Sequence, residues 1–409
     1  MKILWISNVL FPEVCNELKI PVPVVGGWME SGAKALLQMG TTFRLAVASL
    51  YAGDALRCIE GESFRYYLIP AANEKLEAHF KQVRDSFLPD LVHIHGTEYP
   101  HSLAYVNACG TNNVVVSIQG LVSVYAEFYM GGLSSKECTA SLRDILRWDS
   151  LALQQKRMEQ RGELEKELLC RVNHVIGRTS WDRSHVWAIN PNAHYYFGNE
   201  TLRASFYEKK WSYSACEPYS IFLSQAHYPI KGIQQLIKAL PLVKHHYSEV
   251  KVYVAGNDFI HVSALRKNGF TLFIEKLIKR YGVAENIVFL GSLSEEEMAE
   301  QYKKSHVFVC PSAIENSPNS VGEAQLVGVP CIASYVGGSM DMIQEGETGF
   351  LYRFEETALL AYRVCELFGD PGLCTSLSEK ERIVSRERHN ARHNAENLFT
   401  IYQSIFQND

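Results

Sequence analysis

The first half of the chain alternates short apolar runs with longer amphipathic stretches. This alternation is the pattern of β-strands connected by helices around a parallel sheet. The apolar runs predict strands at residues 3–9, 43–50, 65–69, 91–95, 114–118 and 175–177. Because ligands of an open α/β sheet gather beyond the carboxyl ends of its strands, the loops after these runs are the candidate binding regions.

The second half shows the same alternation without repeating the sequence. Its apolar runs predict strands at residues 220–224, 251–255, 287–290, 307–310, 331–334 and 350–352. Six strands in each half predict an α/β fold of two Rossmann-like domains with parallel sheets. Residues 207–219 lack periodicity and contain a proline, which predicts the interdomain linker. We expect a first domain over residues 1–210, a second over 211–389 and a final helix within 390–409.

Composition and charge are those of an ordinary globular protein. The 409 residues are 47% hydrophobic and 21% charged, with a formal charge of −5, and this gives no indication of nucleic-acid binding. The ten cysteines form no CxxC pair, which favours free thiols in a reducing cytoplasm. The N-terminal run lacks a cleavage site and predicts a strand rather than a signal peptide, and no segment has the length of a transmembrane helix. We expect a cytoplasmic protein.

Most of the candidate chemistry lies between residues 307 and 352. An apolar run ends there in a polar turn rich in Pro, Asn and Ser, which Glu315 opens and Glu323 closes with seven residues between them. Ser320-Val-Gly-Glu323 predicts a helix start with Ser320 as its N-cap. A strand, a polar loop and a helix N-terminus in succession suit an anionic, polyhydroxylated ligand, because first-turn N–H groups attract phosphate and carboxylates accept bonds from hydroxyls.

A structural interpretation of the two glutamates stays open. Ser312-Ala-Ile-Glu315 and Ser320-Val-Gly-Glu323 both fit a capping box, in which each glutamate would serve only the backbone. For Glu315 this interpretation is the weaker, because the Asn-Ser-Pro that follows does not continue a helix.

The motifs of this region resemble those of a known family. The pattern P-S-x-x-E-x7-E-A, followed by G-x-P, S-x-x-G-G-x-x-D and G-x-x-G-F-L-Y, is similar to the donor-sugar region of glycosyltransferase family 4. That resemblance implies retaining enzymes of the GT-B fold, with two Rossmann-like domains facing across a cleft that closes on binding. The first domain would bind the acceptor and the second the nucleotide sugar, and the final helix would cross back onto the first domain.

The resemblance also implies roles for individual residues. Glu315 would hold the hydroxyls of the donor sugar and position its anomeric carbon, and Glu323 would accept hydrogen bonds from the ribose. Lys231, within a Lys-Gly pair, would bind the diphosphate and stabilise its developing charge. The donor contacts expected from the resemblance are Gly26, Gly27, Lys231, Gly256, Asn316, Ser317, Asn319, Ser320 and Glu323.

Local chemistry independently supports anion binding at two of these places, Lys231 and the Gly26-Gly27 pair. A lysine at a helix N-terminus is unfavourable with the dipole, so Lys231 favours a bound anion there over a merely solvated side chain. Paired glycines such as Gly26 and Gly27 let a backbone approach phosphate closely, although an isolated pair can also be a flexible turn. The pair is not a G-x-G-x-x-G fingerprint, so a dinucleotide cofactor is not expected.

The sequence departs from the family at two positions. Gln225 stands where the family has an arginine, and Arg178, His227 or backbone groups could substitute for that cation. Gln119 stands where the family has a histidine, and a glutamine cannot take a proton. His95 is therefore the nearer candidate for catalysis and acceptor contact, although a histidine at a strand end is also commonly structural. Arg178 could reach substrate or pair within the chain.

Residues 134–171 predict helical structure with interspersed basic and apolar side chains. Such a surface could contact a lipid-linked acceptor or an anionic membrane, which gives a candidate peripheral membrane association. An ordinary solvated helix is the alternative, because glutamates interrupt the basic pattern after residue 158.

The resemblance implies a retaining hexosyltransferase that moves a sugar from a UDP- or GDP-sugar to a saccharide or lipid-linked saccharide in cell-surface polysaccharide biosynthesis. The departing phosphate would take the acceptor proton in a same-face substitution, with no metal ion or other cofactor. A GT-B sugar-nucleotide epimerase and a non-catalytic sugar-nucleotide-binding protein are the alternatives. The nucleotide base, the sugar, the acceptor, the linkage and the oligomeric state stay open.

Overall fold

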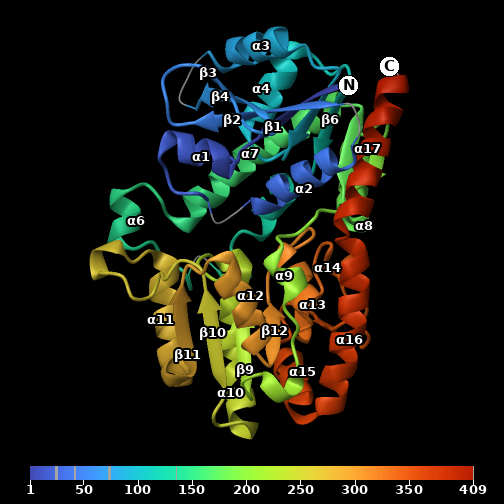
Figure 1. Cartoon of the computed structure of the whole chain (residues 1–409). Helices are drawn as coiled ribbons and strands as arrows, with labels where there is room; N and C mark the ends of the chain where they lie inside the picture. The colour runs from blue at the N-terminus through green and yellow to red at the C-terminus, as the bar shows by residue number, and fades with distance from the viewer. Residues whose placement is uncertain (24–25, 41–42, 72–74, 135, 409) are drawn as a thin grey trace. The chain divides into compact units, whose positions relative to one another are not determined.

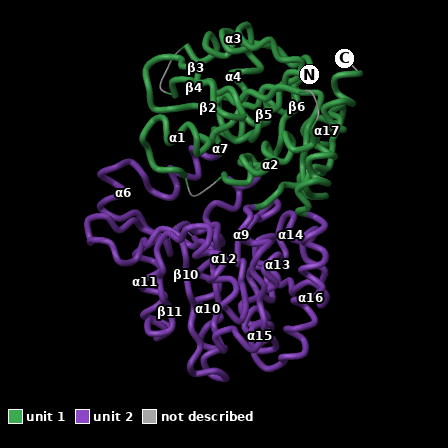
Figure 2. The backbone as a smooth tube through the Cα atoms, in the orientation of Figure 1, with its two compact units in different colours: residues 1–123, 159–202, 389–409 green, residues 124–158, 203–388 purple. Residues whose placement is uncertain are grey.

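The computed structural model describes residues 1–23, 26–40, 43–71, 75–134 and 136–408. The chain forms two compact units (Figures 1 and 2). Unit 1 comprises residues 1–123, 159–202 and 389–409, and unit 2 comprises residues 124–158 and 203–388. This division differs from the expected domain boundaries, because residues 124–158 belong to the second unit and the first unit ends at 202 rather than 210.

Unit 1 is built on an eight-stranded sheet in the order β3-β4-β2-β1-β5-β6-β7-β8. The strands are β1 (Lys2–Ser7), β2 (Arg44–Tyr51), β3 (Arg57–Glu60), β4 (Arg65–Pro70), β5 (Leu91–His95), β6 (Val114–Ser117), β7 (His174–Gly177) and β8 (His194–Phe197). All neighbours are parallel except β3 and β4. The expectation of six strands was wrong, because the two edge strands β3 and β8 are partly or fully exposed and lack an apolar run.

The helices of unit 1 cover this sheet and close its core. They are α1 (Pro12–Leu18), α2 (Gly27–Gln38), α3 (Leu76–Phe87), α4 (Pro100–Cys109), α8 (Ser180–Ile189) and α17 (Ala391–Asn408), together with the later part of α7 (Leu151–Arg171). Helix α1 follows the first predicted strand in a segment for which the sequence pattern predicted no helix, and it begins with a proline at its first position. Helix α17 packs beside α2, and the buried indole of Trp5 on β1 donates to the hydroxyl of Tyr402 on α17 at 3.0 Å.

Unit 2 is built on a six-stranded parallel sheet in the order β11-β10-β9-β12-β13-β14. The strands are β9 (Ser220–Leu223), β10 (Lys251–Ala255), β11 (Ile287–Gly291), β12 (Val307–Cys310), β13 (Cys331–Ser334) and β14 (Phe350–Tyr352). All six were predicted to within one residue, because each is a short apolar run followed by Gly, Pro or polar residues.

The helices of unit 2 pack around this sheet. They are α6 (Leu142–Leu146), α9 (Ser205–Glu208), α10 (Ile233–His246), α11 (Gly269–Tyr281), α12 (Glu295–Lys304), α13 (Asn319–Val327), α14 (Ser339–Met342), α15 (Thr357–Gly369) and α16 (Pro371–Arg388). Because β9 is followed by β10 on one side and paired with β12 on the other, the strand order reverses between β9 and β12. Loops at such a reversal commonly hold the ligand of an open α/β sheet.

Two further properties bear on the sequence-based expectations. All ten cysteines are free thiols. Among the described residues, no helix combines the length and the apolar character needed to cross a bilayer.

Candidate functional site

The reversal point of unit 2 brings Lys231 and Glu315 together. Lys231 lies in a short 3-10 helix (Pro229–Lys231) after β9, and Glu315 lies in the loop after β12. The ammonium of Lys231 donates to Glu315 Oε1 at 2.5 Å, and the hydroxyl of Ser312 donates to the same oxygen at 2.7 Å. Burial acts to lower the pKa of Lys231, but the carboxylate of Glu315 and the neighbouring Tyr228 together outweigh it, and the pKa is raised. The pair therefore holds a charged ammonium at the place where sequence motifs predict a diphosphate.

Glu315 does not cap a helix. Residues 311–318 form no helix, and Ser312 bonds to the side chain of Glu315 rather than to its amide. The second predicted capping box is also wrong, because α13 begins at Asn319 with Pro318 as N-cap and no side-chain cap. Ser320 lies inside the first turn of α13, so both glutamates are released from the backbone role that the sequence left open.

Close backbone contacts at glycines set the position of Glu315. The amide of Gly338 donates to the carbonyl oxygen of Glu315 at 3.0 Å. A Cβ on Gly337, whose φ is +51°, would lie 1.9 Å from that carbonyl oxygen, and a Cβ on Gly232, whose φ is +73°, would lie 1.6 Å from the oxygen of Pro311. Only glycine permits these approaches, so the Lys-Gly and Gly-Gly motifs fix the two loops against each other.

The residues after Glu315 have mixed placements. The amide of Asn316 donates to the hydroxyl of Tyr125 at 2.7 Å, so one expected donor contact is already engaged by a side chain that the sequence did not single out. Ser317 lies beside Met342, with 3.6 Å between its hydroxyl oxygen and the sulfur. Asn319 and Ser320 occupy the first turn of α13, where backbone N–H groups are directed beyond the helix end.

Glu323 is buried in an ion pair with Arg203. Arg203 Nη2 donates to Glu323 Oε1 at 2.8 Å, and the hydroxyl of Tyr302 lies 3.4 Å from the other carboxylate oxygen. Burial raises the pKa of Glu323, and Arg203 acts in the opposite direction. Arg203 was not predicted, because it lies 120 residues before Glu323 in a stretch without a motif.

The ends of β9 and β10 meet at the position of the missing family arginine. A Cβ on Gly256, whose φ is +97°, would lie 3.8 Å from the Cα atom of Gln225. His227 was a candidate substitute for the arginine, but burial and the charge of Lys231 lower its pKa. A neutral imidazole does not replace that cation, which makes Lys231 more important for anion binding in this part of the unit.

In unit 1, the predicted Gly-Gly pair begins helix α2. Gly26 is the N-cap with a φ of +87°, and Gly27 is the first helical residue. A Cβ on Gly26 would lie 2.7 Å from a methyl group of Val9, so the residue before the helix must be small. Val25, also part of the predicted motif, lies outside the described residues.

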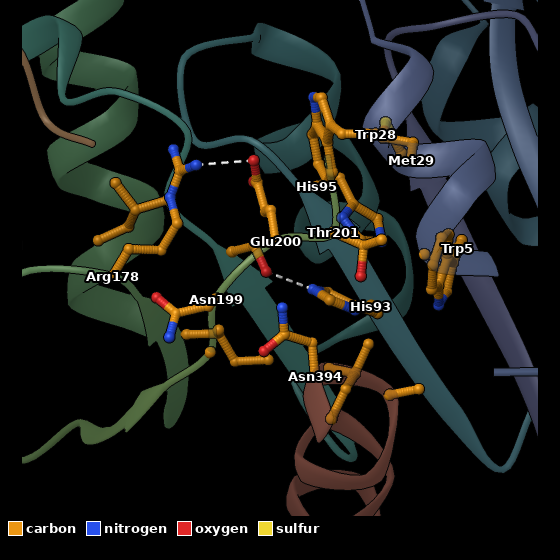
Figure 3. Close-up of a pocket in the computed structure, with 17 residues that line it drawn as sticks. Trp5, Trp28, Met29, His93, His95, Arg178, Asn199, Glu200, Thr201 and Asn394 are labelled. Atoms are coloured by element: carbon orange, nitrogen blue, oxygen red, sulfur yellow. Dashed lines mark hydrogen bonds and ion pairs between the residues drawn. The ribbon is translucent and has the colours of Figure 1, made fainter. Parts of the chain in front are cut away.

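A cavity of about 60 Å³ lies in unit 1 between the sheet, α2 and α17 (Figure 3). His95 lines this cavity with Trp5 and Trp28, whose ring centroids lie 4.4 and 5.9 Å from its own. The side chain of His95 is 3% exposed, and neither ring nitrogen has a hydrogen-bond partner among the described residues. Burial lowers its pKa to about 3, so His95 is neutral at physiological pH and presents one donor and one acceptor.

His93 and Arg178, which also line this cavity, are both paired. His93 lies between the hydroxyls of Tyr402 and Ser117, each 2.5 Å from a ring nitrogen. The guanidinium of Arg178 donates to Glu200 at 2.7 Å and to the backbone oxygen of Gln119 at 3.2 Å. The alternative in which Arg178 pairs within the chain therefore describes this structure, and Gln119 contributes a carbonyl rather than a side chain.

The described part of the chain contains no cluster of side chains that could bind a metal ion. Groups of three or more His, Cys, Asp or Glu side chains with the geometry of a metal site do not occur among these residues.

The two sheets and their helices have the architecture of GT-B glycosyltransferases. Residues 207–384 match the family described as "Glycosyl transferases group 1". The family resemblance and the fold class that the sequence suggested are thus confirmed. The matched region contains Lys231, Glu315, Glu323 and their neighbours.

Curated relatives match over parts of their length. N-acetyl-alpha-D-glucosaminyl L-malate synthase of Bacillus anthracis is 29% identical over 202 residues, 49% of each chain. D-inositol 3-phosphate glycosyltransferase of Streptomyces bingchenggensis is 35% identical over 104 residues, 25% of this chain and 23% of that protein. The chain thus spans about half or less of the length of the curated relatives it matches.

Solved structures match the whole chain at low identity. Sucrose-phosphate synthase from Thermosynechococcus elongatus covers 100% of both chains with a TM-score of 0.73 and 16% identity. The Anabaena protein HepE in complex with UDP covers 99% of this chain and 100% of its own, with a TM-score of 0.67 and 16% identity. At these identities, the likeness establishes the fold alone.

Proposed function

We propose that this protein is a retaining glycosyltransferase that uses a nucleotide-sugar donor. The observation that carries the proposal is the Lys231–Glu315 pair at the sheet reversal of unit 2, inside the region matched by the glycosyltransferase family. The pair offers a cation for a diphosphate and a carboxylate for sugar hydroxyls within one hydrogen bond of each other.

The donor binds to unit 2 in this proposal. Lys231 has three N–H donors, of which Glu315 accepts one and the hydroxyl of Tyr228 engages a second, so one remains for a diphosphate oxygen. Glu315 holds the sugar, the first-turn amides of α13 add donors for phosphate, and Glu323 accepts from the ribose beside its partner Arg203. Lys231 and these amides stabilise the charge that develops on the leaving diphosphate.

The reaction replaces one bond at the anomeric carbon on the same face of the sugar. The bond to the diphosphate oxygen breaks, the bond to the acceptor oxygen forms, and the acceptor proton passes to the departing phosphate. Neither Glu315, paired with Lys231, nor Glu323, paired with Arg203, is assigned as a nucleophile. Because Lys231 supplies the positive charge, the proposal requires no metal ion.

The acceptor is a saccharide or a lipid-linked saccharide that contacts unit 1. The cavity at His95 is lined by two tryptophans, and its arginine is neutralised by Glu200. Rings and uncharged hydrogen-bonding groups suit a hydroxylated, neutral part of an acceptor. A volume of about 60 Å³ admits only a small part of a sugar, such as a hydroxymethyl group.

Named relatives support parts of this proposal. HepE was solved with UDP and with UDP-glucose, which supports a UDP-sugar as the first donor to test, with GDP-sugars as the alternative. WaaG, a structural neighbour, is described as a glycosyltransferase involved in lipopolysaccharide biosynthesis, which supports a role in cell-surface polysaccharide synthesis. A cytoplasmic location at the inner face of the membrane is part of the same proposal.

Incubation of the protein with single UDP- and GDP-sugars, followed by mass spectrometry, tests the proposal. Slow release of the nucleoside diphosphate supports a transferase. An isomeric nucleotide sugar would identify an epimerase, and binding without turnover would identify a binding protein. Retention of the released or transferred sugar's anomeric configuration, followed by NMR, separates a retaining from an inverting reaction, and unchanged rates with a chelator support the metal-free design.

A further inference from the structure

Helix α6 in unit 2 has an inverted polarity. Its aspartate, Asp144, is 2% exposed, whereas its leucines and isoleucine lie outside. The exposed fractions are 77% for Leu142, 62% for Ile145, 81% for Leu146, 74% for the following Trp148 and 85% for Leu265 in the neighbouring 3-10 helix (Ala264–Arg266). We call these five side chains the apolar platform. Single exposed apolar residues are ordinary, but such a group on one short segment and its neighbour marks an interaction surface.

The platform is held in place by the buried side of the segment. Asp144 accepts from the amide of Gly269 at 2.7 Å and from the amide of Ser141 at 3.0 Å. A Cβ on Gly269 would lie 2.3 Å from the carbonyl oxygen of Thr139, so the segment also touches the start of α11 through its backbone. The outward position of the leucines is therefore built into the packing of unit 2, and α6 is not a loose loop.

Trp148 is kept outside at a conformational cost. Its φ is +49°, a left-handed conformation that is rare for a bulky residue. The amide of Asp149 donates to the carbonyl of Asp144 at 2.9 Å, and Arg157 donates to the carbonyl of Trp148 at 2.6 Å. These two bonds hold the backbone in this conformation, and they leave the indole exposed beside Leu146.

The charges around the platform are mainly positive. Residues 136–157 contain five lysines and arginines against three aspartates and glutamates, although the whole chain has a formal charge of −5. Arg143 turns inward to Asp144 and Asp149. Arg147 and Arg266 are exposed and form no salt bridge among the described residues. Exposed arginines beside leucine and tryptophan complement an anionic lipid surface, because their stems cover apolar area while the guanidinium groups reach phosphate.

We propose that the apolar platform docks onto the surface of a phospholipid bilayer that contains anionic lipids. The leucines, Ile145 and Trp148 enter the boundary between headgroups and acyl chains, and Arg147 and Arg266 contact the headgroup phosphates. This surface is separate from the Lys231–Glu315 pair, and its binding to lipid needs neither donor nor acceptor. The proposal therefore goes beyond the proposed transfer reaction and can fail independently of it.

Sedimentation of the full-length protein with vesicles tests this proposal. Vesicles of phosphatidylcholine alone are compared with vesicles that also contain phosphatidylglycerol. The variant Leu142→Asp/Leu146→Asp removes two anchors, and its partition to the anionic vesicles is expected to fall by about tenfold or more. The matched control is Leu242→Asp/Ile383→Asp, which replaces two exposed aliphatic residues on α10 and α16 of the same unit. This control is expected to bind vesicles like the wild type.

A second measurement follows Trp148 itself. Tryptophan quenching by brominated acyl chains should be strong on anionic vesicles and weak in Trp148→Phe, because Trp148 is the tryptophan of the platform. Equal sedimentation with both kinds of vesicle, no sedimentation with the anionic kind, or an equal loss in the control variant would overturn the proposal. It is also overturned if the platform variant abolishes a dimer in light scattering and leaves vesicle binding unchanged, because the surface would then join two copies of the chain.

Discussion

In unit 2 the side chains proposed to bind the donor sugar and the nucleotide, Lys231, Glu315 and Glu323, are charged and paired. In unit 1 the histidines of the cavity are neutral and its arginine is neutralised by Glu200. Lys231 and Glu315 lie 2.5 Å apart on loops that close glycine contacts hold together. His95, in contrast, is uncharged and lacks hydrogen-bond partners among the described residues, between two tryptophan rings. Both sites lie at loops or strand ends near a reversal of strand order.

Because of this difference in charge, we expect the two sites to have different functions. A preformed ion pair can exchange one hydrogen bond for a ligand oxygen without creating a buried, uncompensated charge, which suits the stabilisation of a leaving diphosphate. A neutral histidine can select only by hydrogen bonding and shape. We therefore expect substitutions in unit 2 to act on the donor and on chemistry, and substitutions at the cavity to act on the acceptor and on stability in acid.

The largest effect is expected from Glu315→Ala. The variant removes the group that holds the donor sugar and leaves the ammonium of Lys231 without its carboxylate. Because misplacing a reacting group by about 1 Å can cost roughly 10²-fold in rate, transfer should fall by at least about 10²-fold. Single-turnover transfer with the donor found in the screen measures this loss.

Glu315→Gln serves as the control for this prediction. It keeps the size of the side chain and one hydrogen bond to Lys231 but removes the negative charge, so it should fold normally and retain more activity than the alanine variant. Wild-type turnover by Glu315→Ala in a folded protein would remove Glu315 from the site and end the contrast between the two units.

A smaller effect is expected from Lys231→Ala on nucleotide affinity. A hydrogen bond to a charged group contributes about 1.5–3 kcal/mol, so binding of the nucleoside diphosphate should weaken by roughly 10- to 100-fold. Calorimetric titration with UDP and GDP gives the change directly. Lys276→Ala, at an exposed position of α11, is the matched control for loss of a lysine and should bind as the wild type does. Equal affinities in both variants would contradict a role for Lys231 in binding the diphosphate.

Local sequence signals explain why most of the fold was predictable. Most predicted strands are apolar runs that are buried in the structure, as β12 and β13 illustrate, whereas the predicted edge strand β11 is only partly buried. The elements that were not predicted are exposed or short. Strand β3 is mostly exposed at the sheet edge, β8 is only half-buried, and α1 is a helix of seven residues that the sequence pattern did not predict. Edge strands and short helices carry little periodicity, so pairing with a neighbour decides them.

The candidate site was predictable where a motif fixes the backbone, and not where a partner comes from a distant segment. Glu315 and Lys231 belong to motifs with glycines that the structure shows to be sterically required. Arg203 and Tyr125 were missed, since each reaches the donor loop region from a stretch without a motif. The mistaken N-cap at Ser320 has a simple cause, because the Asn-Ser sequence after Pro318 begins the helix two residues earlier.

The smallest effect concerns His95 and acid stability. The pKa of His95 is lowered to about 3 by burial, against about 6.5 in an unfolded chain, so the unfolded state binds a proton that the folded state excludes between these values. Stability from this residue is complete above pH 6.5 and is lost as the pH falls toward 3. Between about pH 7.5 and about pH 5 the loss should be roughly 2 kcal/mol.

His95→Phe isolates this contribution, because a phenyl ring keeps the contacts with Trp5 and Trp28 and has no proton to bind. Urea unfolding at the two pH values, followed by tryptophan fluorescence, should show a smaller decrease of the unfolding free energy in the variant than in the wild type. His93, also buried and with its pKa lowered by burial, remains in both proteins, so the difference reports on position 95. An identical pH dependence would mean that the ring of His95 is solvated, and a weakened affinity for UDP in this variant would mean that the cavity serves the donor as well. Unchanged UDP affinity with reduced acid sensitivity would instead keep the neutral cavity distinct from the charged donor loops.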